Sequence, residues 1–163
     1  MINYTEKGIG LHDRIAKAGH SLERVNNEWV ASDDAAVQAI IDGYSLVDLK
    51  AELLTNIDEL AKAKRDAVVA NISPAEMASW SIKRAEASAY NGQDSSVPFL
   101  AAEAAARGVP ASALVDKVLA KGAALSGLEA VISGVSGKHC DAIKSAASFS
   151  EALSYDYSTG WPV

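Results

Sequence analysis

The clearest structural signal in this chain is a pair of helices with marked boundaries between Ser73 and Gly108. Ser73 and Pro74 are typical of a helix start, because a serine side chain can accept a hydrogen bond from a free backbone N–H and proline has a helical φ. Glu76 completes a capping box. Pro98 is expected to start the second helix, and Gly108 to end it in a left-handed conformation. The stretch therefore predicts two consecutive alanine-rich helices.

The N-terminal segment 1–44 is predicted to form a helix, a hairpin and a second helix. The first helix ends at Gly19. Asn26-Asn27 separates two β-prone runs, and two residues that tolerate positive φ favour a tight hairpin. Ser32-Asp33-Asp34 supplies an N-cap for the next helix, which Gly43 closes. Because an isolated hairpin is marginally stable in water, we expect it to rest on these helices or on another chain.

Segment 45–72 is predicted to be one long helix. Its apolar residues recur at spacings of three and four, which gives a narrow stripe along one side. Two interpretations remain open: an ordinary helix of a bundle, or a helix that projects and pairs with a second chain. The second interpretation makes part of the stripe a candidate contact surface, formed by Leu49, Leu53 and Ile57.

Segment 73–149 is expected to be a helical domain. A helix starting near Pro110 contains Gly122 and Gly127, and each glycine costs about 1 kcal/mol in a helix interior. These glycines predict a kink, a close helix contact or a break. We further expect a turn over 134–137 and a last helix over 138–148.

The C-terminal segment 150–163 shows no helical period and concentrates large aromatic side chains in a chain with few of them. It is interpreted either as a strap that folds back on the bundle or as an exposed docking tail. Its candidate contact residues are Tyr155, Tyr157 and Trp161. The predicted fold class is therefore mainly α, α+β overall, with a helix–hairpin–helix lobe, a long helix and a C-terminal helical bundle.

Charge and composition exclude several classes of function. The formal net charge of −6 argues against nucleic-acid binding, which requires clustered lysine and arginine. One cysteine, Cys140, permits no intrachain disulfide and suggests a reducing cytoplasm. We expect no signal peptide, because the first residues lack a basic patch followed by an apolar run. We also expect no membrane span, because no uninterrupted apolar segment approaches about 20 residues.

No pattern in the chain predicts a catalytic, cofactor-binding or metal site. Segment 134–139 looks like a phosphate loop, but Ile132 stands where that motif requires glycine, and His139 stands where it requires serine or threonine. His12, His20 and His139 lack metal-ligand spacing and are expected at the surface or partly buried.

The remaining reactive or aromatic residues have structural interpretations. Cys140 is expected in the core. The carboxylate pair Asp33-Asp34 is interpreted as helix N-terminal charge, and Asp58-Glu59 as part of a solvated helix face. Trp29 and Trp80 are expected to anchor the core, while Lys83, Arg84 and Glu86 are expected to point outward. We therefore expect a protein that is not an enzyme.

The chain resembles small tailed-bacteriophage proteins that are encoded beside tail-fibre genes and described as tail-fibre assembly proteins. The similarity covers most of the chain. In its N-terminal part the matching motifs are Tyr4-Thr5-x-Lys7-Gly8-x-Gly10-Leu11-His12 and Ala36-Val37-Gln38-Ala39-Ile40-Ile41-Asp42. Further along they are Lys64-Arg65-Asp66, Glu76-x-x-x-Trp80, Glu86-Ala87, Tyr90, Pro98-x-Leu100, Ala105-Ala106-Arg107-Gly108 and Leu114-Val115-x-Lys117-Val118.

This resemblance implies a non-enzymatic, chaperone-like protein that helps a tail fibre or another tail protein to fold and assemble. Exposed apolar helix faces would shield aggregation-prone fibre segments. The alternative is a structural tail or baseplate component that stays in the virion and forms a homo-oligomer through the long helix. The expected location is the host cytoplasm during assembly, or the virion tail for the structural alternative.

Overall fold

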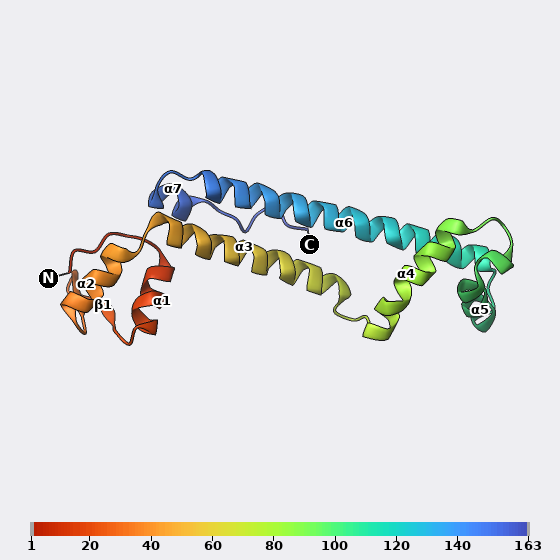
Figure 1. The fold of residues 1–163 in the computed structure, drawn as a ribbon, viewed down its shortest axis with the longest axis horizontal. Coiled ribbons are helices and arrows are strands. Elements are labelled where there is room, and N and C mark those ends of the chain that lie inside the picture. The colour runs from red at the N-terminus through yellow and green to blue at the C-terminus, as the bar shows by residue number, and fades with distance from the viewer. Residues whose placement is uncertain (1, 163) are drawn as a thin grey trace. The chain divides into compact units, whose positions relative to one another are not determined.

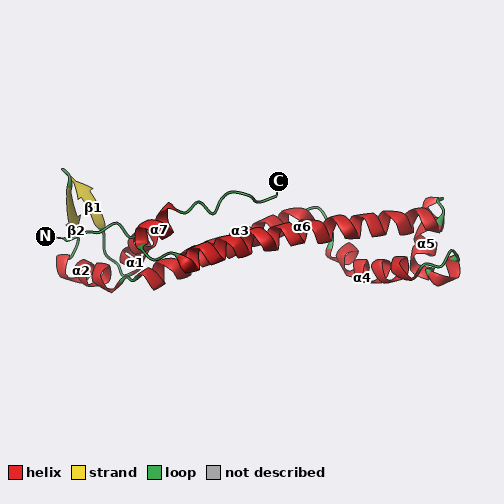
Figure 2. Cartoon of the chain, turned by 90° about the horizontal axis from the view of Figure 1, so that it is seen from above, coloured by secondary structure: helices red, strands yellow, loops and turns green. Residues whose placement is uncertain are grey.

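The computed structural model describes residues 2–162 of the chain, and these residues are mainly helical with one small hairpin (Figures 1 and 2). This confirms the predicted fold class. The helices and strands in chain order are α1 Ile9–Lys17, β1 Leu22–Val25, β2 Glu28–Ala31, α2 Asp34–Gly43, α3 Leu46–Val69, α4 Pro74–Ala89, the short 3₁₀ helix η1 Asp94–Ser96, α5 Pro98–Arg107, α6 Ala111–Ser145 and α7 Phe149–Ser154.

The chain forms two compact units. Unit 1 comprises the chain up to Lys62 together with Val135–Gly160, and unit 2 comprises Ala63–Gly134 together with the chain end from Trp161. Helices α3 and α6 each contribute residues to both units. Each unit thus contains segments that are distant in sequence. Local sequence patterns do not predict which distant segments pack together.

The predicted hairpin is present in unit 1. Strands β1 and β2 are antiparallel, with Leu22 paired to Ala31. Asn26 and Asn27 both have positive φ, 49° and 71°, as the sequence predicts for this turn. The hairpin rests on its own chain, because Trp29 packs against the core of unit 1. Trp29 is half-buried, so it lies at the edge of this core rather than inside it.

The core of unit 1 joins the N-terminal helices to α3 and α7. Asp33 caps α2, accepting hydrogen bonds from the backbone N–H groups of Ala35 and Ala36 at 3.0 Å each. The buried core residues are Ile2, Leu11, Ile15, Val37, Ile41, Tyr44, Leu49 and Ala152. Within this core, the Tyr44 hydroxyl donates a hydrogen bond of 2.7 Å to Glu52. Burial, with the Glu52 carboxylate beside it, raises the pKa of Tyr44.

Unit 2 begins with the capped helix that the sequence predicts. The Ser73 hydroxyl accepts a hydrogen bond of 3.1 Å from the backbone N–H of Glu76, and Gly108 ends α5 with a φ of 67°. Glu86 was expected to point outward, and this is wrong. Its carboxylate accepts hydrogen bonds from the backbone N–H groups of Phe99 at 3.0 Å and Leu100 at 2.9 Å. Glu86 on α4 therefore caps α5, whose start has no cap from its own sequence.

Helix α6 corrects three predictions. It is continuous over Ala111–Ser145, with no break at Gly122 or Gly127, no turn over 134–137 and no separate last helix. Glycine lowers helix stability but keeps its backbone N–H, so buried residues on both sides can hold the helix together. Leu114 and Ile132 are buried on either side of Gly122 and Gly127, and Ile143 is buried beyond residues 134–137. The expected helix contact is found at Gly122, where an added Cβ would lie 3.7 Å from the Arg84 guanidinium of α4, but not at Gly127, where it would meet no atom within 4 Å.

The C-terminal segment contains a helix that the sequence analysis missed. Helix α7 begins after Ser148, whose hydroxyl accepts a hydrogen bond of 3.2 Å from the backbone N–H of Glu151. Ser148 and Glu151 form a capping-box pattern, which is the signal that could have predicted this helix. After α7 the chain folds back within unit 1 as far as Gly160, which favours the strap over the exposed tail.

Candidate functional site

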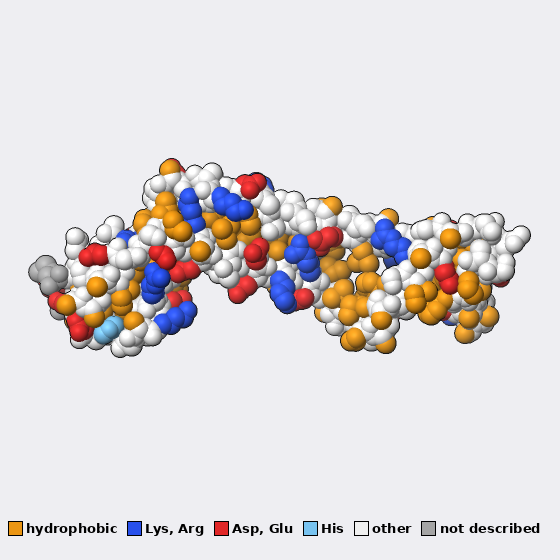
Figure 3. All heavy atoms as spheres, viewed as in Figure 1, with side chains coloured by type: hydrophobic (Ala, Val, Ile, Leu, Met, Phe, Trp, Pro, Cys, Tyr) orange, Lys and Arg blue, Asp and Glu red, His pale blue; other side chains and the backbone are white. Residues whose placement is uncertain are grey.

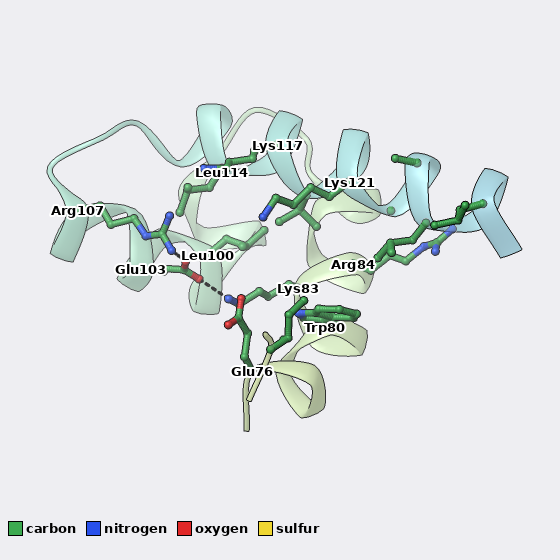
Figure 4. Close-up of a pocket in the computed structure, with 16 residues that line it drawn as sticks. Glu76, Trp80, Lys83, Arg84, Leu100, Glu103, Arg107, Leu114, Lys117 and Lys121 are labelled. Carbon is green, nitrogen blue, oxygen red and sulfur yellow. Dashed lines mark ion pairs between the residues drawn. The ribbon is translucent and has the colours of Figure 1, made fainter. Parts of the chain in front are cut away.

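The candidate functional site is a groove in unit 2 between α4, α5 and α6, with a volume of about 580 Å³ (Figure 4). Figure 3 shows hydrophobic side chains gathered in a hollow of this region, with lysine or arginine side chains at its edge. The groove is lined by Ile72, Glu76, Trp80, Lys83, Arg84, Leu100, Glu103, Arg107, Leu114, Lys117, Val118, Lys121, Gly122, Ala124, Leu125 and Leu128.

Each helix supplies the groove with residues three or four positions apart, so each presents a single stripe. On α6 the stripe runs from Leu114 to Leu128. On α4 it runs from Glu76 to Arg84, and on α5 from Leu100 to Arg107. Pro98 and the cap from Glu86 determine where α5 begins. The starting residue in turn determines which side chains of α5 face the groove.

The floor of the groove is apolar. Leu100 is buried, while Trp80, Leu125 and Leu128 are half-buried and keep part of their surface exposed. Trp80 was expected to anchor the core, but it lines the groove and is only half-buried. An apolar ligand that covers this surface would gain about 25 cal/mol for each Å² of apolar area removed from water.

The edge of the groove is cationic. Five lysine and arginine side chains line it against two glutamates, an excess of three positive groups in a chain of net charge −6. Glu103 is paired with Lys83 at 2.9 Å and with Arg107 at 2.5 Å, as the dashed lines in Figure 4 mark. The hydrogen bond from Lys83 and the nearby positive charges hold the pKa of Glu103 below its usual value.

Lys83 was expected to point outward, and this is wrong, because it is half-buried and paired with Glu103. The prediction holds for Arg84, which is exposed. Its guanidinium donates a hydrogen bond of 3.4 Å to the Ser126 hydroxyl. Lys117 and Lys121 are exposed and form no ion pair among residues 2–162. The groove thus combines apolar surface with more positive groups than negative ones.

The groove offers a ligand two kinds of contact, from apolar side chains and from charged ones. The groove lining contains no histidine or cysteine. Across residues 2–162, no group of three histidine, cysteine, aspartate or glutamate side chains could hold a metal ion. What the described groove offers a ligand is hydrophobic contact together with charge-assisted hydrogen bonds from lysine and arginine.

The contact residues suggested by sequence lie elsewhere. Leu49 and Ile57 are buried in unit 1, and Leu53 is half-buried. The protein's own side chains therefore already cover most of this stripe, and a second chain could contact it only if that packing were disrupted. Tyr155, Tyr157 and Trp161 are half-buried. None of these six residues lines the groove.

His139 corrects the expectation of a surface or partly buried histidine. Among the residues that the structure describes, it is the one buried polar side chain, with an exposed fraction of 1%. Its Nε2 lies 2.9 Å from the Thr159 carbonyl oxygen, and its Nδ1 lies 2.8 Å from the Tyr155 hydroxyl. Since a carbonyl oxygen can only accept, the neutral ring carries its proton on Nε2, and Nδ1 accepts from Tyr155.

The expectations for the cysteine and the two carboxylate pairs are confirmed in part. Cys140 is half-buried, so its expected place in the core is wrong: its neighbour His139 occupies the inward position on α6. Asp33 is confirmed as a helix cap. Asp58 and Glu59 are exposed on α3, as expected for a solvated face.

The sequence analysis missed the groove because its residues were assigned to separate roles. Trp80 was assigned to the core and Lys83 and Arg84 to the outer surface, whereas Leu114, Lys117 and Val118 were noted only within the phage-like motif. Their spacing, together with Lys121 one turn later, is the signal that could have marked one face as both apolar and cationic.

Helix α6 has a second property that the sequence analysis did not expect. Within residues 2–162, it is the helix long and apolar enough to cross a membrane by length and composition, and little of its apolar window is buried. Length and composition alone are weak signals, and the groove-facing stripe of α6 carries Lys117 and Lys121.

Comparison with known proteins found no matching family model, no matching curated protein and no matching solved structure.

Proposed function

We propose that this protein is a non-enzymatic binding protein that assists the folding or assembly of a bacteriophage tail fibre, holding an apolar segment of its partner in the groove of unit 2. The observation that carries this proposal is the apolar floor, formed in part by Trp80, Leu125 and Leu128, which remains partly exposed between three helices. The resemblance of the sequence motifs to tail-fibre assembly proteins supplies the class of partner.

A groove of this kind can cover an apolar fibre segment temporarily. Fibre chains expose apolar segments before they associate, and such segments aggregate. A groove that covers one segment by hydrophobic contact lowers the concentration of the aggregating species, and it releases the segment when fibre association buries more surface. The groove requires no reaction to do this.

Co-expression with the adjacent fibre gene tests the proposal. The wild-type protein should increase the yield of soluble fibre and co-purify with its immature form. Leu125→Glu places a charge in the groove floor and should abolish both effects. Val131→Glu is the matched control, because Val131 lies on the same helix outside the groove and is 48% exposed. Fibre that folds equally well without the protein would refute the proposal.

A second candidate, a structural tail component, is favoured by one observation. Helix α6 exposes the large apolar side chains of Leu119 and Val131, at 42% and 48%. Self-association through α6 would cover them, whereas the stripe on α3 is already largely covered. Mass spectrometry of purified particles distinguishes the two candidates: a structural component remains at fixed copy number, whereas an assembly factor is absent.

A further inference from the structure

We infer that the groove of unit 2 receives an amphipathic helix whose apolar face is bordered by carboxylates. This inference rests on the proposed function, because it names the kind of partner segment that the same groove would hold. Helix-in-groove recognition reads apolar anchors at i, i+3, i+4 and i+7, and the groove offers the complementary surface. Three features of the groove lead to this partner.

The first feature is the partly exposed floor. Trp80 from α4 faces α6 across the groove in Figure 4, and it is half-buried, as are Leu125 and Leu128. A ligand must bring its own apolar face to cover this surface.

The second feature is the distribution of positive charge along the groove. Lys117 and Lys121 stand one turn apart on α6. Arg84 reaches from α4 to Ser126. At about 1.5 Å per residue, the stretch of α6 from Lys117 to Ser126 is about 13 Å long.

This spacing selects among anionic ligands. A fatty acid has one carboxylate at one end and brings a single negative charge to these positions. Glutamates on successive turns of a helix lie about 6 Å apart and can meet Lys117 and Lys121 together.

The third feature is that Lys117 and Lys121 are exposed and make no direct ion pair within the described residues, although Lys117 lies close enough to Glu103 to help lower its pKa. Glu103 is paired with Lys83 and Arg107, whereas Lys117 and Lys121 form no ion pair in the described part of the chain. A positive site in an acidic protein favours encounter with an acidic segment and disfavours a basic one.

The test uses fluorescently labelled synthetic peptides of about 18 residues, roughly five helical turns. One carries leucines at i, i+3, i+4 and i+7 with glutamates on either side. The second has lysine in place of each glutamate. Fluorescence anisotropy with the full-length protein should show the acidic peptide binding at least about tenfold more tightly, with an affinity that falls as salt rises.

The decisive variant is Lys117→Glu/Lys121→Glu, which should reverse the preference between the two peptides. Its matched control is Lys138→Glu/Lys144→Glu, which makes the same charge change on exposed positions of α6 outside the groove and should keep the wild-type preference. Equal affinity for both peptides would overturn the inference. So would oleate or single-stranded DNA binding that depends on Lys117 and Lys121 while the acidic peptide fails to bind.

Failure of this inference is distinguishable from failure of the proposed function. Fibre co-purification that survives Lys117→Glu/Lys121→Glu but not Leu125→Glu would overturn the acidic-helix partner and leave fibre binding intact. A protein that prefers the acidic peptide but never co-purifies with fibre would support the groove specificity and refute the proposed partner.

Discussion

Removing the Tyr155 hydroxyl tests the strap that holds the C-terminal segment in unit 1. In Tyr155→Phe the aromatic ring remains, but Nδ1 of the buried His139 loses the group that donates to it at 2.8 Å. In the neutral ring, Nε2 carries the proton and donates it to the carbonyl of Thr159, so Nδ1 is the acceptor of the hydrogen bond from Tyr155. A buried acceptor left without a hydrogen bond costs about 1–3 kcal/mol. We therefore expect the free energy of unfolding to fall by that amount.

Urea denaturation followed by circular dichroism measures this change, and hydrogen exchange locates it. The amides after Tyr155 should exchange faster in the variant, because the chain there would lose the hydrogen bond from Tyr155 to His139 on α6. Tyr90→Phe is the matched control: Tyr90 is half-buried in unit 2, and its hydroxyl forms no hydrogen bond among residues 2–162 that the structure records. Removing it should change stability by less than about 0.5 kcal/mol.

Two results would refute the reasoning. One is an unfolding free energy that is equal in wild type and Tyr155→Phe. The other is a ¹⁵N NMR spectrum that places the neutral-ring proton of His139 on Nδ1, since the carbonyl of Thr159 would then lack its donor.

Three further predictions concern single helices. Glu86→Ala should destabilise the protein by about 0.5–2 kcal/mol in thermal melts, because the N-terminus of α5 loses the two hydrogen bonds that it donates to Glu86. Glu59→Ala is the control and should have little effect, because Glu59 is exposed. The hydrogen bond from Arg65 lowers the pKa of Glu129 to about 2, so its stabilising contribution is present above pH 4.5 and is lost as the pH falls through about 2. NMR titration should show that midpoint in wild type and a higher one in Arg65→Ala. Gly137→Ala should raise stability by about 0.5–1 kcal/mol if 137 lies in a continuous α6, and lower it if 137 lies in a turn.

Local signals predicted the elements whose ends are decided by neighbouring residues. Ser73, Asp33 and Gly108 mark helix boundaries because each satisfies backbone groups within a few positions, so sequence alone suffices to place them. The hairpin was predictable for the same reason, since Asn26 and Asn27 adopt the positive φ that its turn requires. The helix α7 was predictable in principle from Ser148 and Glu151, and it was missed because the segment was read for periodicity instead.

Tertiary packing decided the rest. Sequence could not show that Glu86 caps α5, because the partner groups are in a different helix. Nor could it show that α6 runs through its glycines, because residues buried against other segments hold it on both sides. The groove arises the same way: Trp80 and Lys121 belong to stripes that look like ordinary core and surface until α4, α5 and α6 come together. Caps and turns depend on groups a few residues apart, whereas a site depends on which distant faces meet.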